Sequence, residues 1–416
     1  MPASWNKEYN PALLAEKIES TRKVSDDGKI RFEGLGFKEF AALLYSMLNF
    51  TQDIPEIDLR QIVSKAIFNS GAKGIITAKS LLAEVNKLEQ EYQKLSTQRY
   101  VLVSSISIDP SLELHKIHLG NKLIVFEKSL PIRFKQEAGN LLRDAEQSLF
   151  ANPPANYMQV RVHVSAKSIH DGAKQALETL DFVRGVWNWA YNRRHFIRET
   201  WGGKPKPVNQ IILGPIHTLH NNNGYLAATN NWWYEPSYLG AIQTLNPKRD
   251  EIDGIYNALN HVRKKFETHK YSDSIKEAFI RYTRALDERN WSIAFLKLWS
   301  ILELLTDTIG TSYETTIKRA SYIYEERDYH LQVLEHLRKY RNSSIHFDKD
   351  NSEMETYLYQ IKNYVEALIG FHINNRLGFE SIQETASFLN LPYDKEVINR
   401  QIEKLSFAKK FHGFSK

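Results

Sequence analysis

The segment WSIAFLKLWSILELLT, residues 291 to 306, is apolar on almost every side of the helix that its spacing predicts. Such a helix is buried among other elements, because water would otherwise contact apolar side chains all round it. Three neighbouring segments repeat apolar residues at the steps of three and four that amphipathic helices show; they are residues 271 to 289, 329 to 343 and 353 to 370. Together the four helices predict a bundle over residues 271 to 375.

The third of these helices ends in the sequence RNSSIH, residues 341 to 346. Arg341 follows Leu334 and Leu337 at helical spacing, so we expect it on the inward side of its helix. A buried guanidinium is costly without an acidic or phosphate partner. Glu303, the one acid of the apolar helix, is therefore a candidate to hold Arg341.

A second arginine followed by a histidine, Arg263 and His269, lies in the polar run HVRKKFETHK. This run has no apolar periodicity, so we interpret it as the solvated end of a helix. The comparison favours the RNSSIH segment as the functional motif.

The order of these helices resembles that of the HEPN superfamily, and most of all its Apea-like branch. An apolar helix with a glutamate in its middle comes first, a helix ending in Arg-Asn before a histidine follows, and a long helix closes the bundle. The resemblance covers about residues 271 to 375, a quarter of the chain. It implies a metal-independent endoribonuclease whose cleft forms between two copies of the motif in a homodimer or higher homo-oligomer. It also implies a toxin or antiviral (phage) defence effector, with an activator or antitoxin left open.

By position, the resemblance assigns Arg341 to the scissile phosphate, His346 to proton transfer and Asn342 to orienting the pair. Glu303 and Ser343 are expected to support the site. The chemistry suits these roles, because a guanidinium fork fits phosphate oxygens and an imidazole titrates near neutrality. The 2′-hydroxyl of RNA is an internal nucleophile, so neither a metal nor a cofactor is required. The products would carry a 2′,3′-cyclic phosphate and a 5′-hydroxyl.

Other interpretations of the motif stay open at this point. In one, Arg341 is a structural residue paired with Glu303, and His346 is an ordinary histidine at a helix end, where its charged form is favoured. The bundle would then serve dimerisation in a protein that binds RNA or a partner without cutting. A nucleotide-binding module is a third alternative, but the chain contains no phosphate loop to support it.

Between residues 184 and 206, basic and aromatic side chains alternate with a single acid. Basic groups follow phosphates while aromatic rings stack on bases, so this segment is a candidate RNA-binding surface. Its candidate contacts are Arg184, Arg193, Arg194 and Arg198. The alternative is that the aromatic rings belong to a core and the arginines form a solvated rim.

Two pairs of histidines three residues apart, His115 with His118 and His217 with His220, raise the question of a metal. Catalytic zinc sites generally use three protein ligands, and no carboxylate stands at a fixed offset from either pair. We therefore predict no metal site.

Composition limits the class of protein. A chain of 416 residues exceeds the size of one core, so several domains are expected. The absence of cysteine excludes disulfides and thiolate metal sites and fits a reducing cytoplasm. No stretch reaches eighteen consecutive apolar residues and no signal-peptide core is present, so we expect a cytoplasmic protein without a membrane association. The net charge of +6 permits nucleic-acid binding.

The rest of the chain divides by its patterns. Residues 1 to 98 are predicted to be helical, with amphipathic stretches at 37 to 50, 57 to 68 and 77 to 95; Gly71 is expected to close the second and Thr77 to cap the third.

From residue 99 to 270 the pattern is that of a mixed α/β region, which would sense a trigger or select the substrate. Strands are predicted at 100 to 108, 115 to 127, 157 to 166 and 209 to 219, and helices at 134 to 150 and 169 to 190. Residues 376 to 416 form a tail of two helices that docks on the bundle or reaches across a dimer. The predicted fold class is a multidomain, mostly helical α+β protein.

Overall fold

The computed structural model describes residues 2–25, 29–32, 36–146, 156–193, 207–228, 232–235, 244–344 and 353–414, with the backbone alone for residues 142–146 and 343–344. Helices dominate this part of the chain, and one six-stranded sheet lies among them. This confirms a multidomain, mostly helical α+β fold. None of the helices described has the length and apolar character needed to cross a bilayer.

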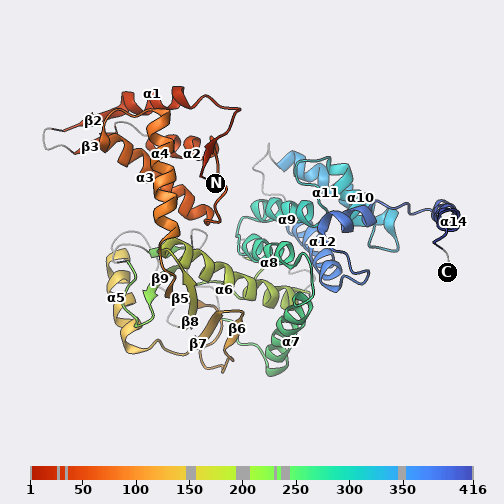
Figure 1. Cartoon of the computed structure of the whole chain (residues 1–416). Coiled ribbons are helices and arrows are strands. Elements are labelled where there is room, and N and C mark those ends of the chain that lie inside the picture. The colour runs from red at the N-terminus through yellow and green to blue at the C-terminus, as the bar shows by residue number, and fades with distance from the viewer. Residues whose placement is uncertain are drawn as a thin grey trace.

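The N-terminal part has a hydrophobic core of its own, drawn from residues 3 to 92 (Figure 1). Its elements are β1 (Ser4–Trp5), α1 (Pro11–Thr21), β2 (Arg22–Val24), β3 (Ile30–Phe32), α2 (Phe37–Ser46), β4 (Leu48–Asn49), α3 (Glu56–Lys73) and α4 (Ala78–Gln93). The three predicted helices are confirmed as α2, α3 and α4. Thr77 caps α4 as predicted, because its Oγ1 accepts from the backbone N–H of Ser80 at 3.1 Å.

One helix end differs from the prediction. Gly71 does not close α3, which continues to Lys73 and stops at Gly74. Gly74 has a φ of 140°, a region that glycine alone adopts without strain. Gly71 is buried inside the helix, where the side chains of Arg22 and Phe32 would contact any Cβ at 3.2 and 3.3 Å. The residue is needed for close packing rather than for a turn.

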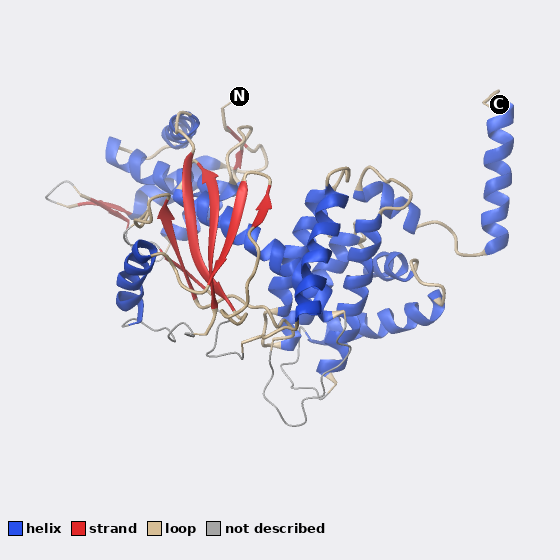
Figure 2. Ribbon diagram, turned by 90° about the horizontal axis from the view of Figure 1, so that it is seen from below, coloured by secondary structure: helices blue, strands red, loops and turns tan. Residues whose placement is uncertain are grey.

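The middle of the chain forms an antiparallel sheet in the order β10-β9-β5-β8-β7-β6 (Figure 2). The strands are β5 (Gln98–Ile106), β6 (Ile117–Leu119), β7 (Lys122–Glu127), β8 (Met158–Ala166), β9 (Ile216–Asn221) and β10 (Trp232–Tyr234). Buried and half-buried residues alternate along β8, because apolar and polar residues alternate in its sequence MQVRVHVSA. One face packs on α6 (Ile169–Asn192), and α5 (Ile132–Glu146) covers part of the other by placing Phe134 against Val101 and Val103.

The helix α6 joins the sheet to the bundle (Figure 1). It contacts β5 and β8 as well as α7 (Arg249–Phe266) and α8 (Ser272–Leu286). At Gly185 the backbone of α6 approaches α8 so closely that a Cβ would lie 2.5 Å from the carbonyl oxygen of Phe279. Sheet and bundle share one continuous hydrophobic core that reaches from Tyr100 to Ile382, so residue 270 does not separate two cores.

The four predicted bundle helices are present as α8, α9 (Trp291–Leu305), α11 (Arg327–Ser344) and α12 (Met354–Asn374), and α9 contacts each of the others. A further helix, α10 (Tyr313–Ser321), packs beside α9 and α11 and was not predicted. The tail helices are confirmed as α13 (Ile382–Leu389) and α14 (Lys395–Phe411).

Candidate functional site

The end of α11 carries the predicted motif. Leu334 and Leu337 are fully buried in the bundle, whereas Arg341, one turn further along, is half-buried. Asn342 beside it is exposed. The inward stripe is therefore confirmed, and its last member lies at the edge of the core, where a dissolved ligand can reach it.

Arg341 rests on an aromatic ring. Its Cζ lies 4.4 Å from the ring centroid of Tyr313, the first residue of α10. Its Nη1 donates to Oδ1 of Asn342 at 3.5 Å. A guanidinium over a ring face is attracted by the ring quadrupole, while its N–H groups point outward in its own plane. The stacking holds Arg341 near the surface in one orientation.

The described part of the chain contains two of the predicted catalytic residues, Arg341 and Asn342. His346 lies outside the described residues, and so does the side chain of Ser343. The geometry of the proton-transfer group is therefore a matter of prediction.

Glu303 lies half-buried in the last turn of α9, nearer the end of the helix than the middle position expected from the sequence. Its Oε1 accepts from Nε1 of Trp299 at 3.0 Å, and the ring of Trp299 meets that of Tyr313 edge to face at 6.1 Å between centroids. The described contacts thus connect Glu303 to Arg341 through two aromatic rings. A direct ion pair between the two stays a prediction.

Tyr313 is the member of this site that the sequence analysis missed. It belongs to α10, whose sequence YETTIKRAS has too few apolar residues to predict a helix by periodicity. Its contact with Arg341 joins two different helices, so no spacing along the chain could have indicated it.

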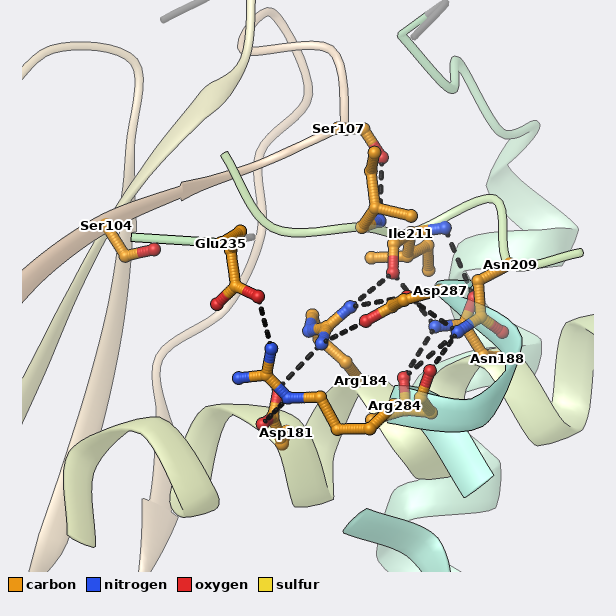
Figure 3. Close-up of polar contacts among 12 residues, drawn as sticks. Ser104, Ser107, Asp181, Arg184, Asn188, Asn209, Ile211, Glu235, Arg284 and Asp287 are labelled. Carbon is orange, nitrogen blue, oxygen red and sulfur yellow. Dashed lines mark hydrogen bonds and ion pairs between the residues drawn. The ribbon is translucent and has the colours of Figure 1, made fainter. Parts of the chain in front are cut away.

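A second group of charged side chains lies where α6, α8 and the sheet meet (Figure 3). Arg184 is fully buried there. Its Nη2 donates to Oδ1 of Asp181 at 2.6 Å and to Oδ2 of Asp287 at 3.0 Å, and its Nη1 donates to the carbonyl of Ile211 at 3.0 Å. Burial by itself lowers the pKa of Arg184, but the two carboxylates outweigh it and raise that pKa above its ordinary value.

The prediction that Arg184 contacts RNA is wrong. The α6 helix turns this side chain into the core, where two carboxylates and a backbone carbonyl take the place of a phosphate. Arg184 therefore lies neither on an RNA-binding surface nor in a solvated rim, the two alternatives predicted for it.

Arg284 of α8 extends the cluster toward the sheet. Its Nε donates to Oδ2 of Asp181 at 2.5 Å, and its Nη1 donates to Glu235. Burial by itself raises the pKa of Glu235, but the hydrogen bond with His217 and the charge of Arg284 lower it to about 2. Glu235 is therefore ionised at neutral pH and ties the end of β10 to α8.

Ser104, His217 and Glu235 are connected in the order of a nucleophile, a base and an acid. Nδ1 of His217 lies 2.9 Å from Oγ of Ser104, and its Nε2 lies 2.8 Å from Oε1 of Glu235. Nucleophilic catalysis also needs an accessible hydroxyl. Ser104 is 3% exposed and His217 1%, so the three side chains satisfy one another's hydrogen bonds inside the fold.

The neighbouring His220 is held in a similar way. Its Nδ1 donates to the carbonyl of Gly224 at 2.8 Å, and its Nε2 lies 2.8 Å from Oγ1 of Thr218. Among the residues that the structure describes, there is no group of three or more histidine, aspartate or glutamate side chains that could hold a metal ion.

A surface cavity of about 780 Å³ opens where the C-terminal halves of α6, α7, α12 and α13 converge. Aromatic and apolar side chains line most of it, and His261, Arg193 and Arg376 add basic groups. The Cζ of Arg193 lies 4.9 Å from the ring centroid of Trp189. The cavity thus combines an aromatic wall with cations, as sites for planar anionic ligands do.

Arg193 is the predicted RNA contact that the structure places in an exposed position, at the end of α6. Arg194 and Arg198 lie outside the described residues. Whether Arg193 contacts RNA stays a prediction.

Comparison with known proteins found no match to this chain among family models, curated proteins or solved structures. The relation to HEPN proteins therefore stays a hypothesis that rests on the motif and on the helices that carry it.

Proposed function

We propose that this chain is a metal-independent endoribonuclease whose active site forms from the α11 ends of two copies. The observation that carries the proposal is the placement of Arg341 and Asn342, which lie side by side at the surface end of α11 with the guanidinium stacked on Tyr313. A guanidinium held in this way offers parallel N–H donors to the oxygens of a phosphate.

In the proposed reaction the 2′-oxygen of the ribose forms a bond to phosphorus while the bond from phosphorus to the 5′-oxygen breaks. The 2′-hydroxyl proton passes to one imidazole, and the 5′-oxygen receives a proton from the other. His346 of the two copies would fill these roles. Arg341 offsets the charge that develops on the phosphate oxygens. The fragments then carry a 2′,3′-cyclic phosphate and a 5′-hydroxyl.

The proposed partners are RNA and a second copy of the chain. On this proposal the protein acts as a toxin or phage-defence effector, and the N-terminal core and the sheet select the substrate or sense a trigger. The separate hydrophobic core of residues 3 to 92 supports such a division of labour, because it is built from apolar residues other than those of the bundle.

The test compares RNA cleavage in excess chelator by the wild type, Arg341→Ala and His346→Ala. We expect the wild type to cut RNA and leave cyclic phosphate ends, and each variant to cut at least about 100-fold more slowly, as loss of a charge-stabilising or proton-transfer group implies. Growth arrest on expression, relieved by Arg341→Ala, would report the same activity where a cellular activator is present.

Matched controls lie on the same helix. Arg338, three residues before Arg341, pairs with Glu335, and His336 is exposed five residues before Arg341. Arg338→Ala and His336→Ala should therefore cut RNA at close to the wild-type rate. Intact RNA with the wild type, both purified and in cells, contradicts the proposal, and so does equal loss of cutting in the control variants.

RNA binding without cleavage is the second candidate function, and the cavity beside Arg193 favours it. That cavity lies at the C-terminal end of α12, whereas Tyr340, next to Arg341, contacts Met354 at its first turn. With a rise of about 1.5 Å per residue, the two ends of α12 are about 30 Å apart. A cavity so far from the motif could bind RNA even where the motif does not cut it.

A further inference from the structure

The last helix, α14, stands apart from the body of the molecule (Figures 1 and 2). None of its residues is buried. The chain just before it is fixed, because the hydroxyl of Tyr393 donates to the carbonyl of Glu325 and the Cζ of Arg327 lies 5.3 Å from the Tyr393 ring centroid. The bundle therefore holds the base of α14 and presents the helix to its surroundings.

This solvated helix is rich in large apolar side chains. The exposed fractions are 44% for Val397, 55% for Ile402, 71% for Leu405, 69% for Phe407 and 76% for Phe411. Most of the stability of a helix in a protein comes from packing its apolar face, and α14 has no such packing within its own chain. Exposed apolar side chains of this size mark an interaction surface. Ile402 and Leu405 share one side of the helix, whereas Phe407 and Phe411 lie on the opposite side. The helix is built to pack against something.

The apolar residues of α14 suit a second copy of the same helix. Ile398, Ile402 and Leu405 follow one another at steps of four and three, the spacing of a helix pair, and Ala408 continues the row. In an antiparallel pair centred on Glu403, position 398 of one helix faces position 408 of the other. The large Ile398 would then lie opposite the small Ala408 twice, once on each side of the centre.

The charges of α14 favour the antiparallel orientation. The helix carries five basic residues and two acidic ones, Glu396 and Glu403. The N-cap Asp394 and Glu396 give its start a net negative charge, although Lys395 lies between them, whereas Lys409 and Lys410 stand in its last turn. A parallel pair would bring the two basic ends together. An antiparallel pair places each basic end beside the acidic start of the partner and also opposes the two helix dipoles.

We propose that α14 pairs antiparallel with α14 of a second copy, forming a two-fold symmetric contact that holds two chains together. Each copy then uses the same surface, as in other isologous interfaces. The proposal is independent of the ribonuclease activity, because α14 contributes no residue to the motif.

The first experiment measures the dimer dissociation constant of the full chain by analytical ultracentrifugation, for the wild type, I402D/L405D and N399D/S406D. Both double variants add two aspartates to α14, but only the first places them in the apolar row. We expect I402D/L405D to raise the dissociation constant at least about 100-fold, since four apolar side chains lose their burial, and N399D/S406D to leave it nearly unchanged.

Neither double variant touches a buried residue, so both should melt at the wild-type temperature. That check separates a lost contact from a misfolded chain. A dissociation constant that I402D/L405D leaves unchanged overturns the proposal, even if the chain dimerises through its bundle.

The second experiment tests orientation and uses the absence of native cysteine. Lys395→Cys and Lys409→Cys chains, carrying different tags, are treated with a short bismaleimide alone and mixed. In an antiparallel pair centred on Glu403, positions 395 and 409 of opposite chains lie within one turn, whereas the two copies of position 395 are about 24 Å apart along the axis.

We expect crosslinked dimers in the mixture, carrying both tags, and few in either chain alone. Efficient crosslinking of Lys395→Cys with itself indicates a parallel pair and overturns the antiparallel arrangement. No crosslink in any sample, at concentrations where the wild type is dimeric, shows that α14 does not pair.

Discussion

Two arginines of this protein, Arg184 and Arg341, lie in opposite environments. Arg184 is fully buried on α6 and donates to Asp181, Asp287 and a backbone carbonyl. Arg341 is half-buried at the end of α11, stacked on Tyr313 beside an exposed asparagine. The first arginine has carboxylates where a phosphate would bind, so it can only hold the fold together. The second lies half-buried at the end of its helix, with its Cζ 4.4 Å from the ring centroid of Tyr313.

The contrast shows that the neighbours of an arginine, rather than the residue type, decide between a structural and a functional role. Arg184 was predicted to lie on an RNA-binding surface because basic and aromatic residues surround it in the chain. Asp181 stands one helical turn before it and was a local signal for an ion pair. The stronger signal, Asp287, is 103 residues away and meets Arg184 only in the folded protein.

The largest effect is expected from Arg184→Met. Removing the guanidinium leaves Asp181 and Asp287 buried with less compensation, which should lower the free energy of unfolding by about 3 to 5 kcal/mol. Urea unfolding followed by tryptophan fluorescence measures this. Arg338→Met is the matched control, because Arg338 also pairs with an acid three residues away but at the surface, where such a pair contributes about 1 kcal/mol or less. Equal losses of unfolding free energy in Arg184→Met and Arg338→Met would show that the buried ion pairs of Arg184 stabilise the fold no more than a surface pair does.

The buried cluster should also be sensitive to acid. The pKa of Glu235 is lowered from 4.5 to about 2, so this group stabilises the fold fully above pH 4.5 and loses that contribution as the pH falls toward 2. The shift corresponds to about 3 kcal/mol. The stability difference between the wild type and Glu235→Gln should shrink over this range in urea titrations at several pH values. A difference that does not change with pH would show that Glu235 is not held by Arg284 and His217.

A smaller change in stability is expected from Arg341→Ala. The lost stacking on Tyr313 should cost about 1 kcal/mol or less, because the contact lies at the edge of the core. Thermal melts of this variant should stay close to those of the wild type while RNA cleavage is lost. A large drop in melting temperature would place Arg341 with Arg184 among the structural arginines.

The smallest effect concerns Arg193. If it binds phosphate, Arg193→Ala should weaken RNA binding a few-fold and reduce the slope of log affinity against log salt by about 1. Fluorescence anisotropy at several salt concentrations measures both quantities. Arg281→Ala is the control, because Arg281 pairs with Glu277 on the surface of α8. If the wild type and Arg193→Ala show the same slope, Arg193 does not bind a phosphate of the RNA.

Much of the fold could be predicted from local patterns. The bundle helices α8, α9, α11 and α12 were indicated by apolar spacing, which depends only on neighbours along the chain. The alternation in β8 indicated a strand for the same reason. The helix α10 was missed because it has few apolar residues, and Gly71 was taken for a helix end although it sits inside α3. In both places contacts with distant residues outweigh the local signal.

The candidate site was predicted in the same uneven way. Spacing along α11 placed Arg341 at the end of a buried stripe, and the structure agrees. The contact of Tyr313 with the guanidinium, and the approach of α12 and α13 to the cavity beside Arg193, could not be predicted. Both bring together helices that are separated in the sequence.

The sequence by itself determined the helical periods, the apolar stripes and the chemical groups at the end of α11, because these follow from residue types at fixed spacing. Only the tertiary structure decided that Arg184 is buried between two carboxylates, that Arg341 reaches the surface, and that α14 keeps its apolar side chains in water. Burial and charge pairing depend on which distant segments meet, and no local pattern encodes that meeting.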